Sequence, residues 1–326
     1  YKLTKLINME NISFLKKYQP KYYKDFYIKK DFIDLLKTLQ KMDNLNILFI
    51  GGKGFGKTSI ILASIREYYN LDLIPKHDVL FINSLKEQGI QYYRNNLKTF
   101  CQTQCSIPNK KKLIILDDFD FINEQSQQVF RNYIDKYSHK VNFLISCKNN
   151  QKVIDNIQSR TTIIKLEAIE KKHFKILFNK IKKKEKIKIT EKAEEFLFYI
   201  CCNSISQMLN NMEKFKLYNK EINILNVKSI CTNISFFSFE KYTNACLNKD
   251  YESSIKIIFN IYNKGYSVLD ILDNYFSFIK ITELVVENKK YNIIKLICKY
   301  IEIFYTIHEN EIELAFFTNN LINNLT

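Results

Sequence analysis

Glycine, proline and tryptophan are scarce in this sequence. Its 326 residues include only 6 glycines, 3 prolines and no tryptophan, although average usage would supply roughly 20 glycines. Lysine, asparagine, isoleucine, tyrosine and phenylalanine are abundant instead, which is typical of an AT-rich genome. Such a bias raises the lysine count without any functional cause, so the formal net charge of +16 has two explanations. It reflects either this bias or a polyanionic partner such as nucleic acid.

Long hydrophobic runs and closely paired cysteines are also missing. No stretch approaches the ~20 apolar residues that span a bilayer, and the sequence does not start with a signal-peptide pattern. We therefore expect a soluble intracellular protein with no membrane partner. The 8 cysteines include no CxxC pair, which favours reduced structural thiols over zinc ligands or disulfides. Disorder is disfavoured because 46% of the residues are hydrophobic, and the length predicts two or three domains.

Short apolar runs alternate with helix-compatible segments in the first half of the chain. The runs have strand length and β-branched or aromatic content, and several are almost wholly apolar, as strands buried on both faces are. Repetition of strand, helix and strand predicts a parallel sheet covered by helices. The runs are LNILFI (45–50), VLFIN (79–83), KLIILD (112–117), VNFLISC (141–147) and TTIIKL (161–166).

The second half of the chain has a different pattern. After residue 166, segments of helical period replace the strand-like runs, and only Gly265 and no proline interrupt them. We expect this half to be helical, with a break near NISFFSF (233–239). The lysine cluster KIKKKEK (180–186) favours a solvated helix face over a binding arm.

Four of the six glycines lie within IGGKGFGKTS (50–59). Gly51-x4-Gly56-Lys57-Thr58 fits the P-loop pattern, in which glycines let backbone N–H groups point at phosphate oxygens. Lys57 is placed to reach the β- and γ-phosphates, and the Thr58 hydroxyl to bind Mg²⁺. The alternative is a glycine-rich turn with a chance lysine, which the scarcity of glycine elsewhere disfavours. The pattern predicts ATP and Mg²⁺ as cofactors.

A second acidic element is expected wherever a P-loop acts on ATP. The run KLIILDDFD (112–120) ends a buried strand in two aspartates. Asp117 at the strand tip is the candidate to hold Mg²⁺ through water, and Asp118 the candidate to polarise an attacking water. The alternative is an aspartate-rich turn after a core strand.

Five segments, in order, resemble the small subunits of replication factor C, the sliding-clamp loader of the AAA+ ATPases. The resemblance covers most of residues 14–166, whereas the C-terminal 160 residues are similar only in helical character and length. The segments are LKKYQPK (15–21), LFIGGKGFGKTSIILASIREYY (48–69), INSLKEQGIQYYRNNLKTF (82–100), QSQQVFRNYIDKYS (125–138) and QSR (158–160).

The resemblance implies a three-part architecture and a set of partners. It implies a RecA-like α/β AAA+ domain (1–166), a helical lid (167–232) and an all-α collar (233–326). In the family, the collars join five subunits into a ring, so we expect other clamp-loader subunits in a hetero-pentamer, a sliding clamp and primer–template DNA as partners. The segment around Leu97 to Pro108, with Phe100 as an apolar anchor, is the expected clamp contact.

The resemblance also assigns roles to individual residues. Arg160 would be the arginine finger that reaches a neighbouring subunit's ATP, and Arg94 and Lys152 would contact DNA phosphates. Tyr18 and Pro20 would lie near the adenine and ribose. The phosphate cradle would be Gly51, Gly52, Lys53, Gly54, Phe55, Gly56, Lys57, Thr58 and Ser59.

Several positions depart from the family pattern. Asp118 stands where the family has glutamate, and shortening this base by a methylene, ~1.5 Å, is a displacement that can cost about 10²-fold in rate. Lys148 occupies the sensor-1 asparagine position and cannot accept a hydrogen bond from water. Ser206 falls on the sensor-2 arginine, while Gly52 and Lys53 replace the two prolines of the loop. These departures predict good ATP binding, slow or absent hydrolysis, and donation of Arg160 to a neighbour.

Two other functions remain open at this stage. One is a structural, hydrolysis-deficient subunit of the same loader. The other is an AAA+ DNA-remodelling ATPase of the initiator or branch-migration type, although the nearly glycine-free helical tail argues against the winged-helix module usual there. A eukaryote-like loader would be nuclear, whereas a large DNA virus would use it in a cytoplasmic factory.

Overall fold

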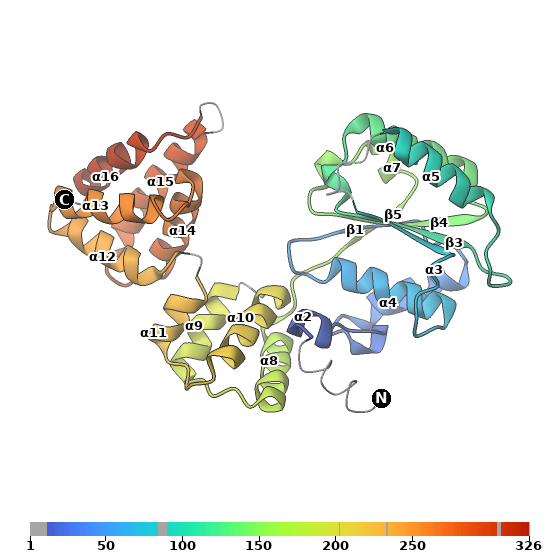
Figure 1. The fold of residues 1–326 in the computed structure, drawn as a ribbon, viewed down its shortest axis with the longest axis horizontal. Helices are drawn as coiled ribbons and strands as arrows, with labels where there is room; N and C mark the ends of the chain where they lie inside the picture. Colours follow the sequence, from blue (N-terminus) through green and yellow to red (C-terminus); the bar gives the residue numbers. More distant parts are fainter. Residues whose placement is uncertain (1–11, 84–89, 202, 233, 305–307, 326) are drawn as a thin grey trace. The chain divides into compact units, whose positions relative to one another are not determined.

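The computed structural model describes residues 12–83, 90–201, 203–232, 234–304 and 308–325 (Figure 1). The chain divides into two compact units. The first combines Tyr1–Ile187 with Cys201–Tyr218, and the second combines Lys188–Ile200 with Asn219–Thr326. The three-part division expected from the sequence stays a prediction.

A parallel sheet of five strands forms the centre of the first unit. The strand order is β2-β3-β4-β1-β5, and all four neighbouring pairs are parallel. Each strand lies within one of the five apolar runs, so the predicted parallel sheet is confirmed. The strands are β1 (Ile47–Ile50), β2 (Val79–Asn83), β3 (Lys112–Asp117), β4 (Val141–Cys147) and β5 (Thr162–Lys165).

Helices cover both faces of this sheet (Figure 1). Alternate strand residues point to opposite faces: Ile47 and Phe49 pack with α4 on one face, whereas Leu48 packs with α5 and α6 on the other. Both faces are buried, which is why the strands are almost wholly apolar. The helices are α3 (Lys30–Lys41), α4 (Lys57–Tyr69), α5 (Ile90–Gln102), α6 (Glu124–Tyr137) and the short α7 (Asp155–Gln158).

The parallel arrangement gathers the loops that follow β1, β3 and β4 at one edge of the sheet. Ligands of open α/β sheets bind beyond the carboxyl ends of the strands, so this edge is the expected site. The single turns η2 (Phe119–Phe121) and η3 (Asn150–Lys152) follow β3 and β4 there.

Three helices complete the described part of the first unit, and a short turn follows the first of them. Buried residues recur every three or four positions on the two long helices, for example Phe174 and Phe178 on α8 or Met208 and Met212 on α10, as expected of amphipathic helices. The four-residue α2 contributes the buried Phe14. The elements are α2 (Phe14–Lys17), η1 (Tyr23–Asp25), α8 (Lys171–Glu185) and α10 (Ile205–Tyr218).

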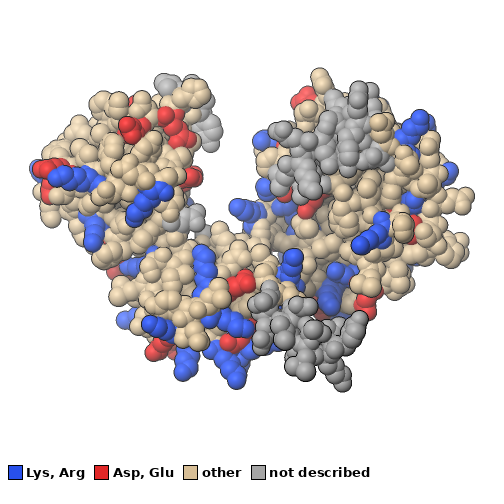
Figure 2. Space-filling view, in the orientation of Figure 1, with Lys and Arg blue, Asp and Glu red and all other residues tan. Residues whose placement is uncertain are grey.

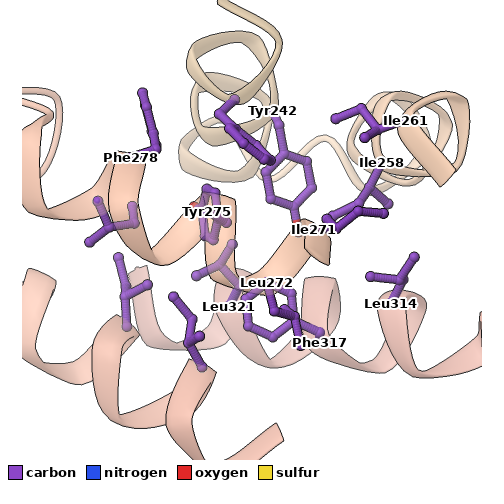
Figure 3. Close-up of a cluster of buried hydrophobic side chains, with 14 of the residues drawn as sticks. Tyr242, Ile258, Ile261, Ile271, Leu272, Tyr275, Phe278, Leu314, Phe317 and Leu321 are labelled. Atoms are coloured by element: carbon purple, nitrogen blue, oxygen red, sulfur yellow. The ribbon is translucent and has the colours of Figure 1, made fainter. Parts of the chain in front are cut away.

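The described part of the second unit is helical, which confirms the prediction for this half of the chain. Its core is aromatic: Tyr242, Tyr275 and Phe317 from three helices pack together (Figure 3). The buried Tyr242 hydroxyl lies 2.8 Å from Thr318 Oγ1, so its polar atom is satisfied. No described helix is long and apolar enough to cross a membrane. The helices are α9 (Glu191–Cys201), α11 (Ile224–Ile230), α12 (Phe236–Leu247), α13 (Tyr251–Tyr262), α14 (Val268–Ile281), α15 (Glu287–Phe304) and α16 (Ile312–Leu325).

Candidate nucleotide-binding site

The glycine-rich loop joins β1 to α4 in the conformation that its glycines allow. Gly54 and Gly56 have φ values of 81° and 87°, in the left-handed region that costs glycine little. A Cβ on Gly54 would also lie 2.1 Å from Ser204 Oγ, just before α10. Among the described residues, no atom lies within 4 Å of a Cβ on Gly56. Gly54 is therefore required by both its backbone and its neighbour, and Gly56 by its backbone alone.

The Lys57 side chain is buried inside this loop. Its Nζ donates hydrogen bonds to the carbonyl oxygens of Gly51 at 2.8 Å and Gly52 at 3.1 Å. Burial lowers the pKa of Lys57, although the nearby carboxylates of Asp118 and Asp117 act in the opposite direction. The ammonium group is held at the centre of the loop, beside the backbone N–H groups that a P-loop uses for phosphate.

Side-chain oxygen atoms of the kind that bind metal ions lie together where β3 ends beside α4. The Thr58 hydroxyl donates to Asp117 Oδ2 at 3.0 Å. Ser146 on β4 donates to Asp117 Oδ1 at 2.5 Å and accepts from the Asp118 N–H at 3.1 Å. A hydroxyl and a carboxylate in contact are the donor types that Mg²⁺ prefers. No motif marks Ser146, whose only signal in the sequence is a polar residue within an apolar run.

Asp118 adopts a left-handed conformation, with φ 52°, and is paired with a cation. Lys148 Nζ lies 3.4 Å from Asp118 Oδ1 and 4.7 Å from the centroid of the Phe121 ring. The carboxylate proposed to polarise water therefore has an ammonium group as its immediate neighbour. The sequence placed both residues at one site, but not in contact.

A cavity of about 690 Å³ adjoins the loop, a volume within the 300–1,000 Å³ typical of small-molecule sites. Its walls combine the segment that follows α2, the loop itself, and residues of α8 and α10. Tyr27 and His173 stack with ring centroids 5.4 Å apart and both line it, and Phe55 and Leu166 add apolar surface. Mostly apolar walls beside a phosphate loop suit a nucleoside. Tyr27 and His173 were not predicted from the sequence, because no motif marks them.

Tyr18 and Pro20, assigned to the adenine and ribose, both line the cavity. The Tyr18 hydroxyl donates to Glu185 at the end of α8. Burial and then this hydrogen bond raise the pKa of Tyr18. Of the remaining loop residues, Ser59 also lines the cavity, whereas the side chain of Lys53 is exposed.

Two family models match this chain. The model of the AAA family, ATPases associated with various cellular activities, matches residues 47–168, and the replication factor C C-terminal domain matches residues 238–303. Replication factor C subunit 4 of Schizosaccharomyces pombe is 28% identical over 290 residues, which are 87% of this chain and 83% of the relative. The chain therefore carries sequence features of an AAA ATPase domain and of the replication factor C C-terminal domain, and over most of its length it is similar to replication factor C subunits.

Related sequences occur in archaea and in a virus. The replication factor C small subunit of Sulfolobus acidocaldarius is 30% identical over 212 residues, 65% of each chain. A relative from Acanthamoeba polyphaga mimivirus that carries a replication factor C small-subunit name is 25% identical over 288 residues, 88% of this chain and 89% of the relative.

Solved structures share the fold. A DNA polymerase III gamma subunit-related protein from Thermotoga maritima has a TM-score of 0.54 at 15% identity and covers 89% of this chain and 99% of its own. The RuvB branch migration motor of the same species has a TM-score of 0.50 at 11% identity, and the match covers 70% of this chain and 79% of the RuvB chain. At these identities the likeness extends to the fold alone.

Of the remaining positions expected from the resemblance to replication factor C, Arg160 and Lys152 do not line the cavity. Arg160 follows α7 at the start of β5, where it forms an ion pair with Asp135 of α6 and donates to the Asn156 carbonyl at 2.7 Å. Lys152 is exposed at the end of η3. Arg94 lies on α5, but its side chain is outside the described part of the structure.

Proposed function

We propose that this chain is the ATP-binding small subunit of a clamp loader that places a sliding clamp on primer–template DNA during replication. The observation that carries the proposal is the assembled loop, with Lys57 at its centre and Thr58 in contact with Asp117. Similarity to replication factor C subunits over most of the chain and the match to the replication factor C C-terminal domain support the same function.

ATP fits the residues around the loop. The adenosine would occupy the apolar cavity, and the phosphates would lie against Lys57 and the N-terminus of α4. No cluster of three or more His, Cys, Asp or Glu side chains that could hold a metal occurs among the described residues. Mg²⁺ would therefore depend on Thr58, Asp117 and the phosphate oxygens of the nucleotide, as is usual for this ion.

Hydrolysis at this site is expected to be slow. Asp118 is shorter than the glutamate of the family, and Lys148 forms an ion pair with its carboxylate. A base paired in this way is less available to an attacking water. The second candidate function is a subunit that binds ATP without hydrolysing it. The same ion pair favours it, and it differs from the slow ATPase only in the residual rate of hydrolysis.

Arg160 would act on another subunit's nucleotide rather than on its own. The register pairs Thr162 with Ile47 and Lys165 with Ile50, so Arg160 precedes the sheet edge opposite to the loop. About six strand residues separate the level of Arg160 from the level of the glycine-rich loop, a distance of ~20 Å at 3.3 Å per residue. An arginine finger supplied to a neighbour matches this placement, provided that the ion pair with Asp135 opens.

DNA is the expected polyanionic partner. The chain has 50 Lys and Arg residues against 34 Asp and Glu, and the face in Figure 2 displays basic side chains over both units. Lys152 and Arg94 would add salt-sensitive contacts to phosphates. The family relatives suit a nuclear or viral replication site.

Co-purification with the other loader subunits and the clamp, combined with ATP binding by the isolated chain, tests the proposal. A five-subunit complex that loads the clamp in the presence of ATP is the expected result. Monomeric behaviour with every partner, or no ATP binding to a folded chain, would refute it. ATP hydrolysis measured on the complex then separates the slow enzyme from the hydrolysis-deficient subunit.

A further inference from the structure

One carboxylate lies at the meeting point of three helices in the first unit. The side chain of Glu185, the last residue of α8, is only 3% exposed. Its Oε1 accepts hydrogen bonds from Lys17 Nζ at 2.5 Å and from the Tyr18 hydroxyl. Its Oε2 accepts from Lys216 Nζ of α10, also at 2.5 Å. We call Glu185, Lys17, Tyr18 and Lys216 the Glu185 clasp.

The clasp keeps Glu185 ionised. Burial of a carboxylate raises its pKa, but the hydrogen bonds from Lys17, Lys216 and Tyr18 outweigh burial and lower the pKa of Glu185 to about 2. A buried carboxylate without such partners would be strongly destabilising. Because the donors come from α2 and α10, the charge is satisfied only when both helices lie against α8.

The four-residue α2 depends on these contacts. A single helical turn is unstable alone. Phe14 is 4% exposed, with Lys17 Nζ 5.8 Å and Lys216 Nζ 5.6 Å from its ring centroid. Its backbone N–H donates to Glu213 Oε2 of α10 at 3.2 Å. The clasp and this apolar anchor together hold α2 on α8 and α10.

Both sides of the clasp border the nucleotide cavity. On the α2 side, Lys17 and Tyr18 line the cavity and Pro20 follows. On the α10 side, Ser206 and Leu209 line it. A displacement of α2 or α10 would therefore move a cavity wall.

We propose that Glu185 is a positioning residue for the nucleotide site: its carboxylate clasps α2 to α8 and α10 so that the cavity walls on both sides are set together. This inference rests on the proposed ATP binding at the cavity. Glu185 itself touches no reacting atom. ATP binding and attachment of α2 then favour each other, because coupling between two sites is reciprocal.

The test compares Glu185→Gln with Glu213→Gln in the full-length chain. Glu185→Gln removes the charge that three donors share, whereas Glu213→Gln keeps an oxygen acceptor for the Phe14 N–H on the same helices. ATP affinity is measured at a temperature at which circular dichroism shows each variant fully folded. Hydrogen exchange is followed for residues 12–20, with and without ATP.

We expect Glu185→Gln to weaken ATP binding about tenfold, within the usual range of such couplings. In this variant ATP should no longer slow exchange in residues 12–20, whereas Glu213→Gln should behave as the wild type in both measurements. A purely structural role would lower the melting temperature and leave affinity unchanged, and that result would overturn the inference. An equal loss of affinity in Glu213→Gln would overturn it too. Failure of the wild-type chain to bind ATP would refute the proposed function itself.

Discussion

The contact between Gly54 and Ser204 makes the replacement Gly54→Ala a sensitive probe of the site. The new alanine would have to adopt φ 81°, and its Cβ would lie 2.1 Å from Ser204 Oγ. Rotation of the hydroxyl can relieve the closest contact, but Ser204 Cβ remains 3.3 Å away. Rotation also removes the oxygen that faces the Gln207 N–H at 3.5 Å, at the start of α10.

The cost of this change has two parts. A left-handed conformation costs an L-residue about 1–2 kcal/mol, and loss of a helix cap costs about 0.5–2 kcal/mol, with the lower end appropriate for so long a hydrogen bond. If the loop instead changes conformation to relieve this strain, its backbone N–H groups move away from the position at which they would bind phosphate. We expect Gly54→Ala to weaken ATP binding by about 2 kcal/mol, or roughly 30-fold.

Three further variants separate these contributions in equilibrium ATP-binding measurements. Gly56→Ala introduces the same kind of backbone strain with no described atom within 4 Å of the new Cβ, and Gly265→Ala introduces it at φ 92° in the second unit. Gly265→Ala should destabilise its own unit by about 1–2 kcal/mol and leave ATP affinity unchanged. The double variant Gly54→Ala/Ser204→Ala should bind ATP more tightly than the sum of the single effects predicts. Additive effects, or an equal loss in Gly265→Ala, would show that the reasoning is wrong.

Four other expectations concern the chemistry of the site and its surroundings. Ser146→Ala should lower the free energy of unfolding by about 1–3 kcal/mol, because it removes the hydrogen bond to the Asp117 carboxylate and the acceptor of the half-buried Asp118 N–H, and a titration of ATP binding against Mg²⁺ should show weaker metal dependence than wild type. Lys148→Asn should raise ATP turnover at least about tenfold by freeing the base; an unchanged or lower rate in steady-state assays would contradict this. Arg160→Ala should leave ATP binding by the isolated chain intact while lowering turnover of the assembled complex by about 10³-fold, and loss of binding would place Arg160 in its own site instead. The pKa of Glu185 is lowered from 4.5 to about 2, so its contribution to stability is complete above pH 4.5 and is lost as the pH falls toward 2; the difference in urea midpoint between wild type and Glu185→Gln should shrink over that window.

Local patterns in the sequence determined the sheet and the phosphate loop. Strands buried on both faces need continuous apolar runs, so the five runs could be located without tertiary information. The loop could be located because left-handed backbone and close phosphate approach restrict residue choice, which makes Gly54 and Gly56 informative one by one. The helical second half followed from periodicity for the same local reason.

Only the tertiary structure decided which side chains meet around the nucleotide site. Ser146 joins Asp117 and Asp118 across two strands, and Glu185 gathers donors that are 31 to 168 residues away in the sequence. Neither set of contacts follows a periodic pattern or a fixed spacing in the sequence, so neither could be predicted from it. Arg160 lies at the end of the strands opposite to the loop. This placement also depends on strand register, which is set by the packing of distant runs. The sequence alone therefore located the glycine-rich loop, while the fold determined which side chains surround it.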